Sequence, residues 1–308
     1  MESKRALRRR TIKPAFDRWI PREKSTWPFQ VFQNYNQELE RNLAAYIPAS
    51  KFVYSKLTTG GALWEDKPEK HLALKIGQKT FTDLKAWSVG FNAFDNWVNL
   101  NILMTISSTF ETYLATIVSV ALQSDPGLLF GSSRSLDGIF VLKNGSISKI
   151  DYEWFIKSCT MGDWMSRLGA YERLFGIAPT ILKNNISTLD KIRIMRNNVG
   201  HAFGRDIDES RKHGIKAILP IESLGREKVL KYQNLLWKIA KSIDKQILIA
   251  HIGEFQALNF YHNLHLTLNK DDHPSVRAQH FKKKLGQSGV QAPSKLFTRQ
   301  LVDYYEKL

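Results

Sequence analysis

The strongest constraint on the fold is an apolar pattern of helical period over residues 103–121. Its members recur every three or four positions through more than four turns: Leu103, Ile106, Phe110, Tyr113, Leu114, Ile117 and Ala121. This spacing places them on one face of an α-helix. The other side carries Ser108, Ala115 and Ser119 around Glu111, and these small residues allow another helix to approach closely. We therefore predict a long core helix that starts near Ala93.

The rest of the chain is also predominantly helical in pattern. Further helices are predicted over residues 35–46, 151–175, 180–203 and 224–251, with Asp151 as an N-cap. The pattern of residues 58–80 predicts a loop region, which can include a short strand. Ile139–Leu142 and Ile147–Ile150 flank Asn144-Gly145, and Asn-Gly is the strongest short hairpin signal. The predicted fold class is mainly α, an antiparallel helical bundle with small β-hairpin insertions.

The charge balance is strongly basic. The 308 residues carry a formal net charge of +16, which favours a polyanionic partner, nucleic acid first and an anionic membrane surface second. A single cysteine, Cys159, excludes an internal disulfide and indicates a reducing, cytoplasmic setting. The most apolar helix carries Glu111 in its middle, so no membrane span is predicted.

Three segments are expected along the chain. Residues 1–34 form a predicted basic arm that Pro14 and Pro21 interrupt, and its cations include Arg5, Arg8, Arg9, Arg10, Lys13, Arg18, Arg22 and Lys24. This arm either contacts nucleic acid or serves as a solubilising tail. Residues 35–268 form the main helical domain. Residues 269–308 form a basic appendage of two short helices joined by residues 286–293, which either pack on the main body, mediate assembly or resemble a helix-turn-helix.

The predicted helix over residues 180–203 carries a polar row that suggests chemistry. Arg193, Asn197 and His201 recur at i, i+4 and i+8, and Arg196 lies beside that row. The apolar residues of the same helix form a separate stripe: Ile192, Met195, Val199 and Ala202. An arginine can hold a phosphate, and a histidine can transfer protons near neutral pH. The alternative interpretation of such a row is a solvated helix face.

The run Arg196-Asn197-Asn198-Val199-Gly200-His201 resembles the signature motif of the HEPN superfamily. Residues 102–114, with Phe110-Glu111, resemble the first core helix of the branch that includes RNase-LS-like and other defence-associated HEPN proteins. Residues 201–208 also match the way in which these proteins leave the motif helix. The resemblance covers roughly residues 92–255.

The resemblance implies a metal-independent endoribonuclease that leaves a cyclic phosphate and a 5′-hydroxyl. Two chains would form a homodimer with one composite site, in which Arg196, Asn197 and His201 are catalytic. Glu111, Arg193 and Asn198 would support them. The resemblance also implies a toxin or antiviral defence role, RNA as substrate, and a regulatory partner or antitoxin.

HEPN toxins with a nucleotidyltransferase antitoxin carry a tyrosine two residues after the histidine. Here that position is Phe203, which has no hydroxyl to accept a nucleotide, so the sequence departs from this subgroup.

Two other interpretations remain open. A HEPN-fold module that binds RNA or a partner enzyme without cutting explains the charge equally well. A helical assembly protein that buries the polar row is the third candidate. No cofactor or metal is expected, because His262 and His265 have no cysteine or acidic trio nearby.

Overall fold

The computed structural model describes residues 16–73, 81–145, 151–211, 219–269, 271–289 and 293–308. These residues are mainly α-helical and contain no strand. They form two compact units. The central unit comprises Ser25–Ser119 and Asp151–Ile247, and the terminal unit comprises the described residues of Met1–Lys24, Val120–Ile150 and Leu248–Leu308. The predicted boundaries at residues 34 and 268 do not coincide with this division.

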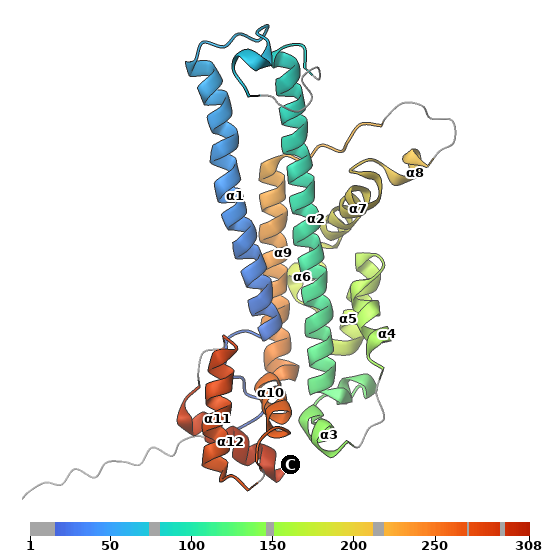
Figure 1. Cartoon of the computed structure of the whole chain (residues 1–308). Coiled ribbons are helices and arrows are strands. Elements are labelled where there is room, and N and C mark those ends of the chain that lie inside the picture. The colour runs from blue at the N-terminus through green and yellow to red at the C-terminus, as the bar shows by residue number, and fades with distance from the viewer. Residues whose placement is uncertain (1–15, 74–80, 146–150, 212–218, 270, 290–292) are drawn as a thin grey trace, which may run out of the picture. The chain divides into compact units, whose positions relative to one another are not determined.

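Three long helices build the central unit, and shorter helices complete it (Figure 1). The long ones are α1 (Trp27–Thr59), α2 (Leu84–Ser124, whose last residues belong to the terminal unit) and α9 (Arg226–Ile247). The shorter ones are the 3-10 turn η1 (Pro68–Lys70), α4 (Glu153–Thr160), α5 (Trp164–Phe175), α6 (Thr180–Lys183), α7 (Ile186–Ala202) and α8 (Ile207–Ser210).

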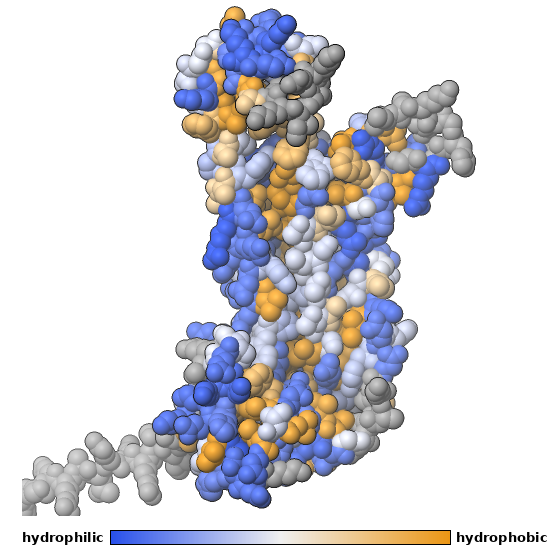
Figure 2. All heavy atoms as spheres, in the orientation of Figure 1, coloured by the Kyte–Doolittle hydropathy of each residue, from blue (hydrophilic) through white to orange (hydrophobic). Residues whose placement is uncertain are grey.

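The core of the central unit lies where α1, α2 and α9 meet. The predicted apolar face of α2 is buried, and Leu103, Phe110 and Ile117 are each at most 1% exposed. Phe32 of α1 packs 5.4 Å from the Tyr113 ring, whose hydroxyl donates a hydrogen bond of 2.9 Å to the Ala240 carbonyl of α9. Hydrophobic side chains lie in the seam between α1 and α2, whereas hydrophilic ones cover the outward side of α1 (Figure 2).

Both long N-terminal helices extend beyond their predicted bounds. The helix predicted over residues 35–46 runs from Trp27 to Thr59, and the core helix predicted from Ala93 begins at Leu84. The extensions pack on each other, since the Tyr54 ring lies 5.9 Å from Trp87 and 5.5 Å from Phe91. Contacts distant in sequence therefore stabilise turns whose local pattern is weak.

The helix predicted over residues 151–175 is two helices, α4 and α5. The break falls at Met161–Asp163, where Gly162 has a φ of 87° and Asp163 accepts a 2.8 Å hydrogen bond from the Ser166 N–H as the N-cap of α5. Asp151 accepts a 2.9 Å hydrogen bond from the Glu153 N–H but is not the N-cap of α4, which is Tyr152. Cys159 is buried as expected, and burial raises the pKa of its thiol to about 12.

The terminal unit contains η2 (Pro126–Phe130), α3 (Gly138–Asn144), the π-turn η3 (Leu248–Ile252), α10 (Phe255–His265), α11 (Pro274–Gln287) and α12 (Lys295–Lys307). Its core includes Tyr261, Phe281 and Leu301, which are fully buried. The two helices predicted within residues 269–308 are confirmed, and they pack on α10, where Tyr261 lies 5.4 Å from Phe281 and 5.1 Å from Tyr305.

The predicted hairpin at residues 139–150 is wrong for its first strand, because Ile139–Leu142 lie inside α3. Asp137 caps that helix by accepting a hydrogen bond of 3.1 Å from the Ile139 N–H. Gly145 has a φ of 61° and ends the helix in the left-handed conformation. Asn-Gly here supplies a helix C-cap, which needs the same positive φ as a hairpin turn. The predicted second strand, Ile147–Ile150, lies outside the described residues.

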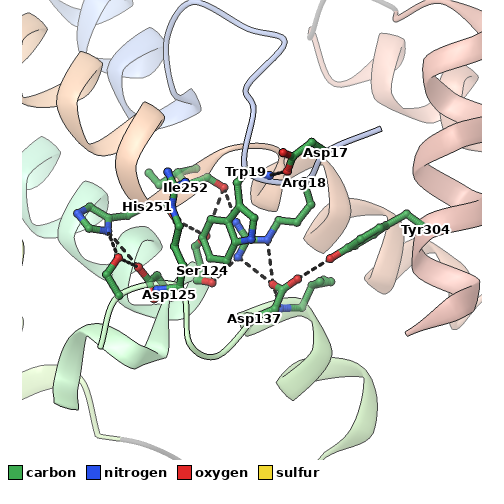
Figure 3. A network of polar contacts seen from close by, with 12 residues as sticks. Asp17, Arg18, Trp19, Ser124, Asp125, Asp137, His251, Ile252 and Tyr304 are labelled. Carbon is green, nitrogen blue, oxygen red and sulfur yellow. Dashed lines mark hydrogen bonds and ion pairs between the residues drawn. The ribbon is translucent and has the colours of Figure 1, made fainter. Parts of the chain in front are cut away.

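The predicted basic arm includes an arginine that is not available to a ligand. Arg18 is 1% exposed and joins the beginning of the described chain to the rest of the terminal unit (Figure 3). Its guanidinium pairs with Asp137 at 2.8 Å and donates to the carbonyls of Ser124 and Ile252. It also lies 3.4 Å from the Trp19 ring centroid. Residues 1–15 of the arm lie outside the described residues.

One described helix, α2, is long and apolar enough to cross a membrane by length and composition. Half of its apolar window is buried inside the protein.

Candidate functional site

Two members of the polar row of the motif helix, Arg193 and Asn197, line a groove of the central unit. Helix α7 buries Leu189, Ile192 and Met195, which are at most 5% exposed, and so confirms the predicted stripe at Ile192 and Met195. The polar residues on the other sides of α7 therefore face the protein surface. Arg193, Arg196 and Asn197 are half-buried there.

Glu111 is the centre of this site. Its neighbours Phe110 and Tyr113 are buried, which fixes this turn of α2 and directs the carboxylate toward α5 and α7. One carboxylate oxygen pairs with the Arg196 guanidinium of α7, and the other pairs with Arg167 of α5 at 3.1 Å. A single carboxylate thus joins two arginines from two helices.

Arg167 was not predicted from the sequence. It is 5% exposed, its Nε donates a 3.0 Å hydrogen bond to the Gly162 carbonyl, and its guanidinium lies 4.8 Å from the Trp164 ring. Burial lowers the pKa of Arg167, and Glu111 opposes that effect by stabilising the cation. The signal was present, because position 167 shares the buried face of α5 with Trp164 and Tyr171, where a charged residue requires a partner.

Arg196 is held on one side by its neighbour. Its Nη1 donates a 3.0 Å hydrogen bond to the Asn197 side-chain oxygen, so Asn197 orients the arginine. The Arg196 Nε is buried and has no acceptor among the described residues. Arg193 pairs with Asp190 at 2.9 Å, and Asp190 also accepts a 3.2 Å hydrogen bond from the Trp164 N–H at the start of α5.

The groove has a volume of about 460 Å³. Glu111, Arg167, Arg193, Arg196 and Asn197 line it, together with the loop residues 160–162. The lining carries three guanidinium groups and one carboxylate, and Arg193 is paired with Asp190 outside the lining, so an excess of positive charge remains at the groove. Guanidinium groups match the oxygens of phosphate and carboxylate groups, so the groove can bind an anion.

His201 lies apart from this cluster. It is exposed in the last turn of α7 and does not line the groove, and its side chain has no hydrogen bond or ion pair within the described ranges. Asn198 contributes its backbone carbonyl to the end of the helix, where it accepts the N–H of Phe203 and, at 2.9 Å, that of Gly204. Phe203 has a φ of 54° and is 55% exposed. The structure therefore groups Arg193, Arg196, Asn197 and Glu111, whereas His201 and Asn198 lie outside the groove.

Within the described residues, no group of three or more histidine, cysteine, aspartate or glutamate side chains has the arrangement to hold a metal ion. Comparisons with protein-family models, with curated proteins and with solved structures found no match to this chain.

Proposed function

We propose that this chain is a metal-independent endoribonuclease of HEPN type that acts as a homodimer. The observation that carries the proposal is the groove in which Arg167 and Arg196 pair with Glu111 and Asn197 contacts Arg196. Arg196 and Asn197 lie on the same helix, α7, as His201. The formal net charge of +16 supports a polyanionic substrate. A toxin or antiviral defence role, held in check by a regulatory partner, belongs to the same proposal through the sequence resemblance.

In the proposed reaction the RNA supplies its own nucleophile. A base removes the proton of the ribose 2′-hydroxyl, and the 2′-oxygen forms a bond to phosphorus. The bond from phosphorus to the 5′-oxygen breaks, and an acid protonates that leaving oxygen. The products are a 2′,3′-cyclic phosphate and a 5′-hydroxyl. Arg196 would stabilise the charge that grows on the phosphate oxygens, and His201 would transfer the protons.

The position of His201 is the reason for including a second chain in the proposal. The groove of one chain has no histidine in its lining, and His201 is exposed at the end of α7. Two proton transfers need two groups, or one group in two states. A second copy would bring its own His201, so a shared site could hold two imidazoles and two arginines.

The test is cleavage of single-stranded RNA in EDTA by the parent chain and by Arg196→Ala and His201→Ala. His280→Ala is the matched control, because His280 is also an exposed histidine and lies on α11 of the terminal unit. Both site variants are expected to lose cleavage by a factor of about 100 or more, while the control cuts like the parent. Mass spectrometry should find cyclic phosphate ends. Equal cleavage by parent and site variants would overturn the assignment.

A non-catalytic HEPN-fold RNA-binding or assembly module is the second candidate. The observation that favours it is the separation of His201 from the arginine groove. Intact RNA after long incubation, together with salt-sensitive binding that Arg196→Ala weakens, would support binding without cleavage.

A further inference from the structure

A second groove, with different chemistry, lies between α1 and α9 in the central unit. Its volume is about 520 Å³, within the range of roughly 300–1,000 Å³ that is typical of small-molecule sites. Both helices contribute positions spaced i, i+3, i+4 and i+7, the spacing of one helix face. In α1 these begin at Gln33 and end at Glu40, and in α9 they begin at Leu230 and end at Trp237.

The groove is lined by carboxamides, and two of them stand at buried positions where packed helices ordinarily place apolar side chains. Five of its residues are amides: Gln33, Asn36, Gln37, Gln233 and Asn234. Asn36 and Gln233 form the most buried part, at 7% exposure each. Burying amides between helices costs stability unless partners satisfy them. Below them the same helix pair packs through Phe29, 5.2 Å from Trp237, so the change from aromatic to amide is local.

The protein uses little of the hydrogen-bonding capacity of these amides. Each carboxamide offers two N–H donors and an acceptor oxygen. Asn36 donates a 2.8 Å hydrogen bond to the Phe32 carbonyl, and Gln233 donates a long one of 3.5 Å to the Asn36 oxygen. Within the described residues these are the only hydrogen bonds of the five side chains. Donors and acceptors therefore converge on the groove with capacity for a ligand.

The groove chemistry selects among ligand classes. Side-chain amides pair with the donor and acceptor edges of nucleobases, and an aromatic ring stacks on a base. Trp237 is half-buried at one end of the groove and supplies such a ring. The only charged residue in the lining is Glu40, so the groove itself does not suit a phosphate. Lys238 and Lys241 are exposed on the adjoining face of α9, and these cations are suited to a phosphate.

We propose that this amide groove binds a nucleobase, whose sugar and phosphate extend toward Lys238 and Lys241. Asn36 and Gln233 would pair with the edge of the base, and Trp237 would stack on it. The base can come from a free nucleotide or from an unstacked position of single-stranded RNA. The inference rests on the groove alone and holds whether or not the chain cuts RNA.

The test measures the binding of adenosine, AMP and short 2′-O-methyl RNA. The methyl group blocks the nucleophile, so binding is measured without cleavage. Asn36→Leu and Gln233→Leu replace buried amides with apolar side chains of similar size, and circular dichroism checks that each variant is folded. Asn34→Leu is the matched control, because Asn34 is an exposed amide of α1 outside the groove. Each groove variant is expected to weaken binding about tenfold, and the control is expected to bind like the parent.

The probes also distinguish the source of the base. Lys238→Ala should weaken AMP and RNA several-fold and leave adenosine unchanged, because adenosine has no phosphate. Binding of adenosine or AMP supports a free nucleotide, and binding of RNA alone supports a base within a strand. The proposal is overturned if the parent binds none of the three probes. It is equally overturned if both groove variants bind them like the parent.

Discussion

Asp244 gives the sharpest prediction about stability. Its side chain is 2% exposed on α9, and it accepts hydrogen bonds from the hydroxyl and the backbone N–H of Thr26, the N-cap of α1. Burial raises the pKa of Asp244 from 3.8 to about 6, and the two Thr26 hydrogen bonds only partly oppose this. The folded chain therefore holds the proton more tightly than the unfolded chain.

The sign and size of the effect follow from linkage. Because the pKa of Asp244 is raised on folding, its contribution to stability is fully present below the unfolded pKa and is lost as the pH rises through about 6. One pKa unit corresponds to ~1.4 kcal/mol, so the full effect on the free energy of unfolding is ~3 kcal/mol. We therefore expect acidification from pH 7.5 to pH 5 to raise the free energy of unfolding by ~1–2 kcal/mol.

The assay is urea unfolding of the parent and of Asp244→Asn at both pH values, followed by circular dichroism. Hydrogen exchange of α1 peptides gives a local readout. The neutral variant should lack this part of the pH dependence, so its stability relative to the parent is greater at pH 7.5 than at pH 5. Asp208→Asn, an exposed aspartate of the same unit, should keep the parent's dependence. The reasoning is refuted if the parent and Asp244→Asn change equally with pH.

Arg18→Lys should destabilise the terminal unit by about 1–3 kcal/mol, because three separate guanidinium nitrogens donate to Asp137 and to two carbonyls, and a single ammonium nitrogen cannot reach all three acceptors; hydrogen exchange of α12 peptides measures this, and unchanged protection would contradict it. Gly253→Ala should also destabilise that unit, because a Cβ would lie 2.2 Å from the Arg18 carbonyl oxygen at a φ of 53°. A melting temperature equal to the parent's would disprove this. Glu111→Gln should bind 2′-O-methyl RNA about tenfold more tightly, because it frees two guanidinium groups from their counter-ion; equal or weaker binding in an anisotropy titration would count against an anion groove.

The helices were predictable where a single apolar stripe decides the structure. The apolar stripe of α2 from Leu103 to Ala121 and the stripe of α9 through Tyr232, Leu236 and Ile239 are buried as the period indicates. Their ends were less predictable, because they depend on distant contacts, as the packing of Tyr54 on Trp87 illustrates. Asn144-Gly145 marks a positive φ correctly, but that signal alone does not distinguish a helix end from a hairpin.

Helical spacing predicted the candidate site only for residues of one helix, and Glu111 of α2 was included only through the family resemblance. The spacing on α7 predicted that Arg193, Arg196 and Asn197 share a surface, and they line one groove. The position of Arg167 on the buried face of α5 indicates that it needs a partner, but the identity of that partner depends on how α5 packs beside α2, which no local pattern reports. His201 satisfied the spacing along α7 but lies outside the groove, because the residues from Arg193 to His201 extend over about two turns of helix, and only the first of these reaches the loop at residues 160–162.

The two grooves share a physical origin. Each forms where a helix places polar side chains at positions that face another helix, with Glu111 and Arg167 in one case and Asn36 and Gln233 in the other. Such residues cost stability unless they find partners. In the first groove the arginines find a carboxylate, so the charges are partly satisfied within the protein. In the second groove the amides remain largely unpaired with protein groups, so a ligand there would form new hydrogen bonds without first breaking an ion pair. We therefore expect the amide groove to be less salt-sensitive than the arginine groove.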